Sequence, residues 1–391
     1  MFSKIAMGIG ESETIKVADI ARKLREEGKD IISFAVGEPD FDTPEIIKTA
    51  GKDAIDSGFT KYTDLKGIKK LRNKICQKLK RDNNLTYTDD EIVVSNGAKH
   101  ALFNALCALV NPGEEVLIVA PAWVSYVEQV KLIGAKPVIL NSPDDLSMPV
   151  EEIKNNINSN TKAIMINSPS NPTGKVYTED ELKALAEIVL QHENLYVISD
   201  EIYEKIIHKP SVHVSIASLS PEIKDRTVVI NGFSKAYAMT GWRMGYSASN
   251  IQIAKLIAKI QSHMTSCPCS ISQYACLEAV ELDEQEITKM VTKFEQRRKI
   301  LEDFFDKKPE LKYTKPDGAF YFFVDFSPYI GKKVKNSMEL SMYLMEKAHI
   351  AVTAGSAFFK ENYIRISYAT SEKNIREGLS RLDKALKELN E

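Results

Sequence analysis

Short apolar runs alternate with longer helical patterns along most of this chain, and this rhythm restricts its fold more than any other feature. The runs EIVVS, EVLIVA, KAIMINS, YVISD and TVVIN are short and rich in β-branched residues, and segments with apolar residues at helical spacing separate most of them. Strands that alternate with helices favour a mostly parallel sheet with helices on its faces. The sequence therefore predicts an α/β fold.

The pattern changes after about residue 270. A long helical stretch covers residues 270–305, and the apolar runs AFYFFVDF and YIRISYA then lie among further helical patterns. Strands bracketed by longer helices suggest a smaller α+β unit. A chain of 391 residues is too long for one compact core of usual size, so two domains are expected. Because no low-complexity linker separates them, their boundary should be a continuous helix.

The charge balance argues for small-molecule partners. Fifty-two Lys and Arg residues against 54 Asp and Glu residues give a net charge of −2, which lacks the basic excess of proteins that bind nucleic acids or anionic membranes. No apolar run approaches the roughly 20 residues that cross a bilayer, and the N-terminal MFSKIAMGIGESE lacks the long apolar core of a signal peptide. We expect a cytoplasmic protein with no nucleic-acid or membrane partner.

The spacing of cysteine and histidine residues disfavours disulfide and metal chemistry. The five Cys residues are odd in number and form no CxxC pair, and the six His residues form no HExxH motif. The expectation is free thiols and no bound metal.

Residues with chemical potential follow the predicted strands, and ligands of open α/β sheets gather beyond the carboxyl ends of strands. Lys235 lies just past TVVIN, near the small residues Gly232 and Ser234. A Lys in a tight, partly desolvated loop can lose its proton and act as an amine nucleophile. Asp200 ends the run YVISD, where a carboxylate can pair with a pyridinium nitrogen or simply cap a helix.

Other strand ends carry binding groups. The loop PSNPTGKV presents Asn171, and the glycine turn in NGAKH opens a helix at Ala98 and Lys99, whose free N–H groups favour a phosphate. Trp123 offers a flat face for a ring, and the guanidinium of Arg365 in YIRISYA suits a carboxylate. Each residue alone also has an ordinary explanation, as a surface charge, a turn or a core aromatic. Their combination at successive strand ends predicts one ligand site.

Motifs along nearly the whole chain resemble those of the class I and II aminotransferases, which are pyridoxal-phosphate (PLP) enzymes of fold type I. The similarity is greatest to the aspartate aminotransferase branch of bacteria and archaea. The most specific matches are NGFSKAYAMTGWRMGY and NSPSNPTGKVY, and the others are GEPDFDTP, TKYTDLKGIKKLR, SNGAKHALFN, PAWVSY, SDEIYE, PDGAFYFF and YIRISYATS. The resemblance implies a large PLP-binding domain over residues 37–279, and a small α+β domain formed by the N-terminal arm 1–36 and residues 280–391.

The resemblance also implies how the cofactor is held. Lys235 would carry PLP as a Schiff base, and Asp200 would hold the pyridine nitrogen. Tyr203 and Asn171 would hydrogen-bond the ring hydroxyl oxygen, and Trp123 would stack on the ring. The expected phosphate ligands are Arg243, Ser234 and the backbone at Ala98 and Lys99, together with Tyr62 of the partner subunit. A homodimer is therefore the expected functional unit.

For the substrate, the resemblance implies that Arg365 binds the 2-carboxylate beside Asn171 and Trp123, and that the backbone of Gly37 closes over it. Lys99 matches the position where the aspartate-specific branch places a Lys to meet a distal carboxylate.

The N-terminal arm and two prolines complete what the resemblance implies. Ser12 and Thr14 would add hydroxyl contacts to the substrate, and cis peptide bonds would precede Pro121 and Pro172. Gly232 departs from the pattern, since many relatives have Ser there, so one hydroxyl contact to the phosphate would be missing.

The expected activity is transfer of an amino group between an amino acid and a 2-oxo acid in two half-reactions. Aspartate or glutamate is the expected donor and 2-oxoglutarate or oxaloacetate the acceptor, with aromatic substrates or prephenate also admitted. The main alternative is another PLP reaction on the same fold, β-elimination or decarboxylation, because a fold does not fix its chemistry. A non-catalytic amino-acid sensor is a further alternative, which the absence of a basic balance disfavours.

Overall fold

Seven strands form the main sheet of the structure, a computed structural model that describes residues 2–10, 13–331 and 333–390. In the order in which they lie, they are β2 (Ile92–Ser95), β8 (Gly245–Ala248), β7 (Thr227–Gly232), β6 (Tyr196–Asp200), β5 (Thr161–Asn167), β3 (Glu115–Ala120) and β4 (Lys136–Asn141). Only β8 runs antiparallel to its neighbours; every other adjacent pair is parallel. The predicted α/β fold is confirmed.

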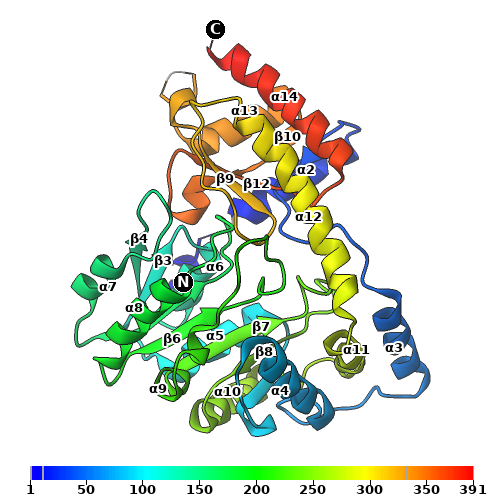
Figure 1. Cartoon of the computed structure of the whole chain (residues 1–391), viewed down its shortest axis with the longest axis vertical. Helices are drawn as coiled ribbons and strands as arrows, with labels where there is room; N and C mark the ends of the chain where they lie inside the picture. Colours follow the sequence, from blue (N-terminus) through cyan, green and yellow to red (C-terminus); the bar gives the residue numbers. More distant parts are fainter. Residues whose placement is uncertain (1, 11–12, 332, 391) are drawn as a thin grey trace.

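Helices cover both faces of this sheet (Figure 1). One face packs against α5 (Ala98–Leu109), α6 (Val124–Leu132) and α10 (Ile251–Met264), and the other against α7 (Val150–Asn156), α8 (Glu179–Leu190) and α9 (Pro221–Asp225). Along β3, Val116 and Ile118 face the first group, while Leu117 and Val119 face the second. Both faces of the strand are therefore apolar, which explains its continuous run of apolar residues.

Two strands of the sheet have no strong signal in the sequence. β4 contains a proline and has only one fully buried residue, because it is the edge strand next to β3. β8 is the four-residue segment GYSA, whose glycine and serine have low strand propensity. Pairing with β2 and β7 decides both its conformation and its antiparallel direction.

The remaining elements include a second unit built from both ends of the chain (Figure 1). Strand β1 (Ile32–Ser33) pairs with β10 (Ile350–Ala351), and β11 (Thr353–Ala354), β12 (Tyr363–Ser367) and β9 (Tyr321–Asp325) form an antiparallel sheet. Helices α2 (Glu13–Glu26), α13 (Ser337–Ala348) and α14 (Glu372–Asn390) pack in this unit, whereas α1 (Lys4–Met7) contacts α6, α3 (Glu45–Asp56) packs against α11 (Ser270–Val280) and α4 (Lys69–Asn83) packs on the main sheet beside β2. The division at residues 36/37 and 279/280 stays a prediction.

The helical stretch after residue 270 is interrupted. It forms α11 (Ser270–Val280) and α12 (Glu284–Phe305), and the side chain of Asp283 caps the second helix by accepting a hydrogen bond from the N–H of Gln285. The expectation of one continuous helix is therefore wrong, because an N-cap residue starts a new helix here. Helix α12 runs from the lower part of the view in Figure 1 to the part that contains β9 and β12.

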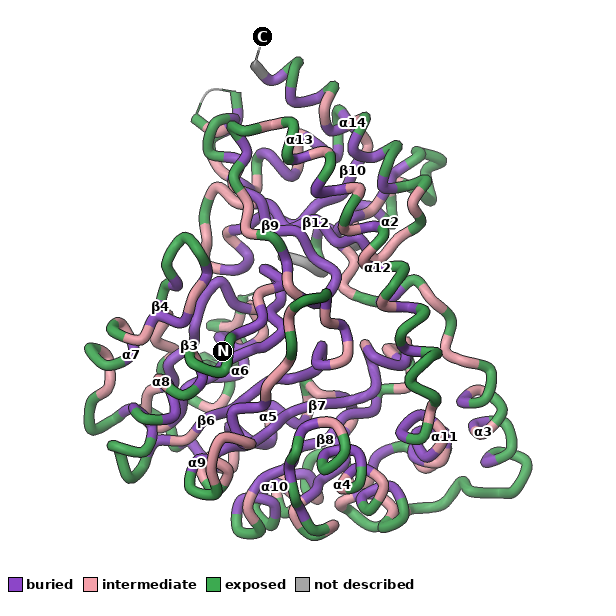
Figure 2. Tube along the Cα trace, in the orientation of Figure 1, coloured by how far each residue is buried: buried purple, intermediate pink, exposed green. Residues whose placement is uncertain are grey.

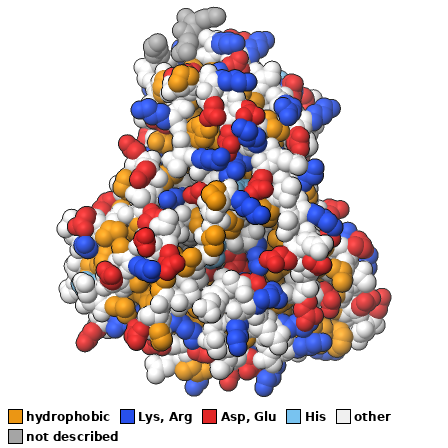
Figure 3. Space-filling model, viewed as in Figure 1, with side chains coloured by type: hydrophobic (Ala, Val, Ile, Leu, Met, Phe, Trp, Pro, Cys, Tyr) orange, Lys and Arg blue, Asp and Glu red, His pale blue; other side chains and the backbone are white. Residues whose placement is uncertain are grey.

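The surface of the molecule carries mixed charges. Buried residues concentrate along the strands, whereas the outward sides of the helices are exposed (Figure 2). Basic and acidic side chains are interspersed over the face in Figure 3, in keeping with the net charge of −2. No helix among the described residues is long and apolar enough to cross a membrane.

Candidate active site

A cavity of about 430 Å³ brings the predicted site residues together. Its lining includes Gly37, Ala98, Lys99, Trp123, Asn171, Asp200, Tyr203, Ser234, Lys235, Arg243 and Arg365. Tyr62 does not line it and is 90% exposed, so within this subunit it has no part in the cavity. Ser12 and the side chain of Thr14 lie outside the described part of the chain.

The sheet explains why these distant residues meet. Asp200 is the last residue of β6, and the turns that follow β3, β5 and β7 present Trp123, Asn171 and Lys235. Because parallel strands end at the same edge of a sheet, their following turns surround one crevice. The predicted cis peptide bonds before Pro121 and Pro172 are confirmed, and the peptide bonds before Pro169 and Pro210 are also cis.

The amine of Lys235 is poised for reaction. Its Nζ donates a hydrogen bond to the carbonyl oxygen of Gly37. Burial lowers the pKa of Lys235 to about 8, and the cations Arg365 and Arg243 act in the same direction, whereas Glu38 opposes them. A larger share of this side chain is therefore an unprotonated nucleophile at neutral pH than for an exposed lysine.

Asp200 is a buried carboxylate held by donors. Its Oδ2 accepts a hydrogen bond of 2.7 Å from the hydroxyl of Tyr126, and its Oδ1 accepts one of 3.1 Å from the N–H of Ile202. Burial raises the pKa of Asp200 to about 6, although the hydrogen bonds from Tyr126 and Ile202 lower it. At pH 7 the group is mostly ionised, so it is able to hold a proton on a neighbouring basic nitrogen.

Arg365 is a buried cation that lines the cavity and has no carboxylate partner among the described residues. Only 3% of it is exposed, and it donates hydrogen bonds to Oδ1 of Asn171 at 2.8 Å and to the carbonyl oxygen of Ala35 at 2.7 Å. The rings of Tyr321 and Phe358 lie 4.5 and 4.9 Å from its guanidinium carbon. No ion pair joins it to another described residue, and its Nε has no hydrogen-bond partner among them. A buried unpaired charge is costly, so a ligand anion is the natural partner.

The start of α5 provides hydrogen-bond donors for a phosphate-sized anion. Gly97 precedes this helix with φ +85°, and a Cβ there would lie 2.5 Å from Nη2 of Arg243. Only glycine therefore lets this guanidinium lie against the helix N-terminus, where free N–H groups and the helix dipole attract an anion. Ser234 adds a hydroxyl to the lining.

The surroundings of Gly232 do not support the expectation that a serine there would contact the phosphate. A Cβ on this residue would meet Cα of Gly245 and the carbonyl oxygen of Met244, both at 2.9 Å, and the residue does not line the cavity. A serine would thus clash with β8 in this backbone and would not reach an anion in the cavity. Glycine allows close pairing of β7 and β8 here.

Several lining residues escaped the sequence analysis, among them Glu38, Tyr126, Asn167 and Tyr321. Tyr126 lies in the first turn of α6, three residues after Trp123, which precedes the helix as its N-cap, and the two rings meet edge to face. Tyr321 lies in the motif PDGAFYFF, where it begins β9. Their contacts depend on how separate elements pack, which residue spacing does not encode.

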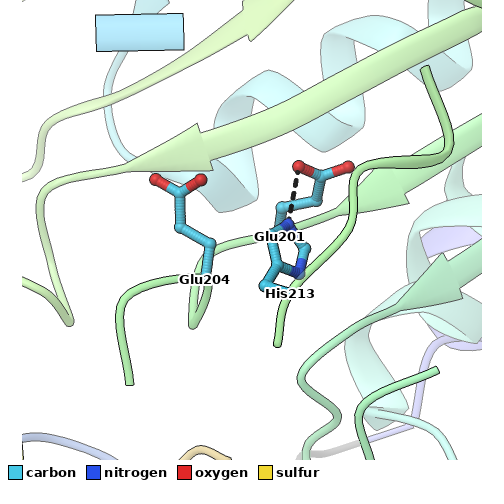
Figure 4. A group of neighbouring side chains, drawn as sticks. All are labelled: Glu201, Glu204 and His213. Atoms are coloured by element: carbon cyan, nitrogen blue, oxygen red, sulfur yellow. Dashed lines mark hydrogen bonds and ion pairs between the residues drawn. The ribbon is translucent and has the colours of Figure 1, made fainter. Parts of the chain in front are cut away.

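A second group of ionisable side chains joins the turn that carries Tyr203 to the later segment that contains His213. Figure 4 shows Glu201, Glu204 and His213 together, with His213 hydrogen-bonded to Glu201 at 3.2 Å. The ammonium of Lys78 binds Oε1 of Glu204. Because Lys78 already supplies the positive charge that a metal ion would bring, the group forms a buried ion network and does not resemble a metal site.

The cavity residues fit PLP. A nucleophilic amine suits its aldehyde, the buried carboxylate of Asp200 suits its ring nitrogen, and the cradle of Gly97 and Arg243 suits its phosphate. The fold and this site define a PLP-dependent enzyme of fold type I. Residues 29–382 match the model of the family Aminotransferase class I and II, and the chain belongs to that family.

Known relatives agree with this assignment. The chain is 43% identical to an aspartate aminotransferase of Bacillus sp. (strain YM-2), covering 96% of each chain. It is also 43% identical to a probable aspartate/prephenate aminotransferase of Aquifex aeolicus (strain VF5), covering 97% of this chain and 96% of the relative. A solved structure of the Thermus thermophilus aspartate aminotransferase with maleate matches with a TM-score of 0.94 and 36% identity, over 98% of this chain and 99% of the other.

The family membership confirms the resemblance found in the sequence. The protein is a PLP-dependent aminotransferase that transfers amino groups between amino acids and 2-oxo acids. The alternative of a lyase or decarboxylase on the same fold is not favoured.

Proposed function

We propose that this aminotransferase prefers dicarboxylic substrates, with aspartate or glutamate as donor and 2-oxoglutarate or oxaloacetate as acceptor. The observation that carries the proposal is a pair of cavity cations, Lys99 and Arg365, neither of which forms an ion pair with another described residue. A substrate with two carboxylates satisfies both cations, whereas an alanine or phenylalanine substrate satisfies only one.

The position of Lys99 supports its role. Its Nζ lies over the ring of Trp123, 4.6 Å from the centroid, and the residue lines the cavity. Burial of the side chain, helped by the nearby charge of Arg243, lowers the pKa of Lys99. A ligand carboxylate would relieve that penalty, since an opposite charge restores the preference for the ammonium form.

The names of relatives point the same way. The Bacillus and Thermus proteins are named aspartate aminotransferases, and the Thermus structure contains maleate, a dicarboxylate. The Aquifex relative is named for prephenate as well. We therefore propose dicarboxylic preference without exclusive specificity, and Tyr321, which lines the cavity with its ring near Arg365, is suited to contact an aromatic substrate.

The positions of the cavity residues support a proposed role for each of them in cofactor binding. Arg243, Ser234 and the start of α5 would hold the phosphate, and Trp123 would cover the ring. Asp200 would keep a proton on the pyridine nitrogen through its carboxylate, while Asn171 and Tyr203 would bind the ring hydroxyl oxygen. When bound, PLP supplies an electron-withdrawing ring that stabilises negative charge on the adjacent carbon.

Lys235 serves two purposes in this scheme. Its Nζ is the amine that holds the cofactor, and after release the same atom is a base close to the α-hydrogen of the substrate. Arg365 orients the substrate by its 2-carboxylate with help from Asn171, and Gly37 covers it. The lowered pKa of Lys235 suits both tasks, because a base must be free of its proton before it accepts one.

A homodimer with shared sites is part of the proposal. Tyr62 is exposed, yet its loop is held in place: Gln261 donates to the carbonyl oxygen of Leu65 at 2.8 Å, and Gln273 donates to Oγ1 of Thr63 at 3.0 Å. A fixed loop with an exposed aromatic tip suits contact with a partner subunit. The cytoplasmic location stays a prediction.

The test is the ratio of kcat/KM for aspartate to that for alanine and for phenylalanine. The wild type should favour aspartate, and Lys99→Ala should lower both ratios by at least about tenfold, as expected when a charge-assisted hydrogen bond is lost. Lys80→Ala, which removes an exposed Lys of α4, is the matched control and should change neither ratio. A wild type that prefers alanine, or an unchanged ratio in Lys99→Ala, would contradict the proposal.

A further inference from the structure

The hydroxyl of Tyr321 is buried at a junction between the groups assigned to cofactor and substrate. Tyr321 is completely buried, begins β9 and lines the cavity. Its hydroxyl oxygen lies 2.8 Å from that of Tyr203, and its ring lies 4.5 Å from the guanidinium carbon of Arg365. One side chain therefore contacts the residue assigned to the ring hydroxyl oxygen and the residue assigned to the substrate carboxylate.

The same hydroxyl also limits what residue 37 can be. A Cβ on Gly37 would lie 2.9 Å from Oη of Tyr321 but 3.9 Å from its Cζ, and the backbone of Gly37 is not in the left-handed region. An alanine there would thus be excluded by the hydroxyl and not by the ring or the backbone. Because Gly37 also accepts the hydrogen bond of Lys235, the hydroxyl rests against the segment that covers the reacting amine.

We propose that the Tyr321 hydroxyl is a positioning group for the aminotransferase reaction. It orients the Tyr203 phenol towards the cofactor, and its contact with Gly37 determines how closely the Gly37 segment approaches Tyr321 in the cavity wall. The inference rests on the roles proposed above for Tyr203 and Arg365. Tyr321 acts through these neighbours and is not itself a catalytic residue.

The hydrogen bond between Tyr203 and Tyr321 joins two phenols that each carry a proton. Burial raises the pKa of Tyr203 and of Tyr321, so both keep their protons at neutral pH. When Tyr321 donates to the oxygen of Tyr203, the proton of Tyr203 remains available to a cofactor oxygen, and the first hydrogen bond polarises the second. Without the Tyr321 hydroxyl, Tyr203 is a weaker donor, and its hydroxyl loses the hydrogen-bond partner that orients it.

The first measurement is a pH titration of the cofactor absorbance in the holoenzyme. A weaker donor leaves the cofactor oxygen more basic, so in Tyr321→Phe the titration midpoint should move to higher pH by about half a unit. The value of kcat should fall by about threefold to tenfold, as expected for one weakened hydrogen bond, while KM stays near the wild-type value because the ring under Arg365 remains. Tyr313→Phe, which removes a phenol outside the cavity, should leave the midpoint and kcat unchanged.

The second measurement uses the contact with Gly37. Gly37→Ala should reduce kcat/KM strongly in the wild-type background. It should have little further effect in Tyr321→Phe, because the nearest ring carbon, Cζ, then lies at an ordinary contact distance from the new Cβ. An unchanged midpoint in Tyr321→Phe, or equal damage by Gly37→Ala in both backgrounds, would overturn the inference. If the wild type lacks the dicarboxylate preference, the substrate proposal fails separately, because the midpoint comparison does not depend on substrate.

Discussion

At the scale of single residues, the surroundings of Lys235 favour the reactivity proposed for its amine. Burial and two arginines lower its pKa, and a backbone carbonyl of the Gly37 segment orients its amine. None of these neighbours is close to Lys235 in the sequence except Arg243. The sequence motif therefore predicts which lysine is reactive, while the fold supplies the surroundings that lower its pKa.

Replacing Lys235 tests whether this one residue both holds the cofactor and transfers the proton. In Lys235→Ala the rate of amino-group transfer between aspartate and 2-oxoglutarate should fall by several orders of magnitude, because the nucleophile and the proton carrier are removed together. The far-ultraviolet circular dichroism spectrum and the oligomeric state should match the wild type. Near-normal turnover would show that another residue performs the chemistry.

The pH dependence of cofactor uptake tests the lowered pKa of Lys235. The free amine increases as pH rises through about 8, so the rate at which the apoprotein takes up PLP should increase through the same range. In Glu38→Gln the carboxylate that raises this pKa is gone, and the midpoint of the rate profile should lie at lower pH than in the wild type. The ionisation of PLP itself is common to both proteins and cancels in the comparison; an equal or higher midpoint would contradict the assignment.

Contiguous motifs made most of the cavity residues predictable. Lys235, Asp200 and Asn171 each belong to a short string at a strand end, and the rule that parallel strands end at one edge predicts that they meet. Tyr126 and Tyr321 were not predictable in this way, because a hydrogen bond between residues 126 and 200, or 203 and 321, arises only from packing.

At the scale of elements, the turn after β6 depends on buried charges. Lys78 and Asn83 of α4 both bind the carboxylate of Glu204, one residue beyond Tyr203. Burial alone would raise the pKa of Glu204, but Lys78, His213 and Asn83 outweigh it and lower the pKa below its ordinary 4.5. The pair therefore stabilises the fold at neutral pH, and this contribution is lost as pH falls through the lowered pKa.

Lys78→Met should destabilise the protein by about 3 kcal/mol at pH 7, since it leaves Glu204 buried without a cation. Urea unfolding measures the change. The matched control is Lys80→Met, an exposed position on the same helix, which should cost less than about 0.5 kcal/mol. Adding Glu204→Gln to Lys78→Met should recover part of the loss, and a neutral effect of Lys78→Met would show that the pair contributes no net stability.

Elements with a strong local pattern were predictable and the others were not. The apolar runs of β3, β5, β6 and β7 predicted strands because both faces of each are buried. In contrast, β8 is too short and too rich in small residues to show a pattern, and only its two neighbours determine it. The break between α11 and α12 depends on one capping residue, Asp283, within a sequence that otherwise favours helix.

At the scale of the whole molecule, hybrid dimers test whether Tyr62 serves a neighbouring site. Tyr62→Ala and Lys235→Ala subunits are each expected to form defective homodimers. If Tyr62 acts across the interface, a hybrid of the two contains one site with both residues intact, and it should show about half the wild-type activity per dimer. If Tyr62 acts within its own subunit, the hybrid has no intact site and gains no activity over the two parents.

The pairing of β1 with β10 also sets an order of events during synthesis on the ribosome. Residues 32–33 leave the exit tunnel early, but their partners at 350–351 appear only after the entire seven-stranded sheet has been translated. At typical elongation rates the interval is on the order of tens of seconds. The nascent arm must remain unpaired throughout this interval, so the cavity, which needs Gly37 from one end of the chain and Arg365 from the other, is completed last.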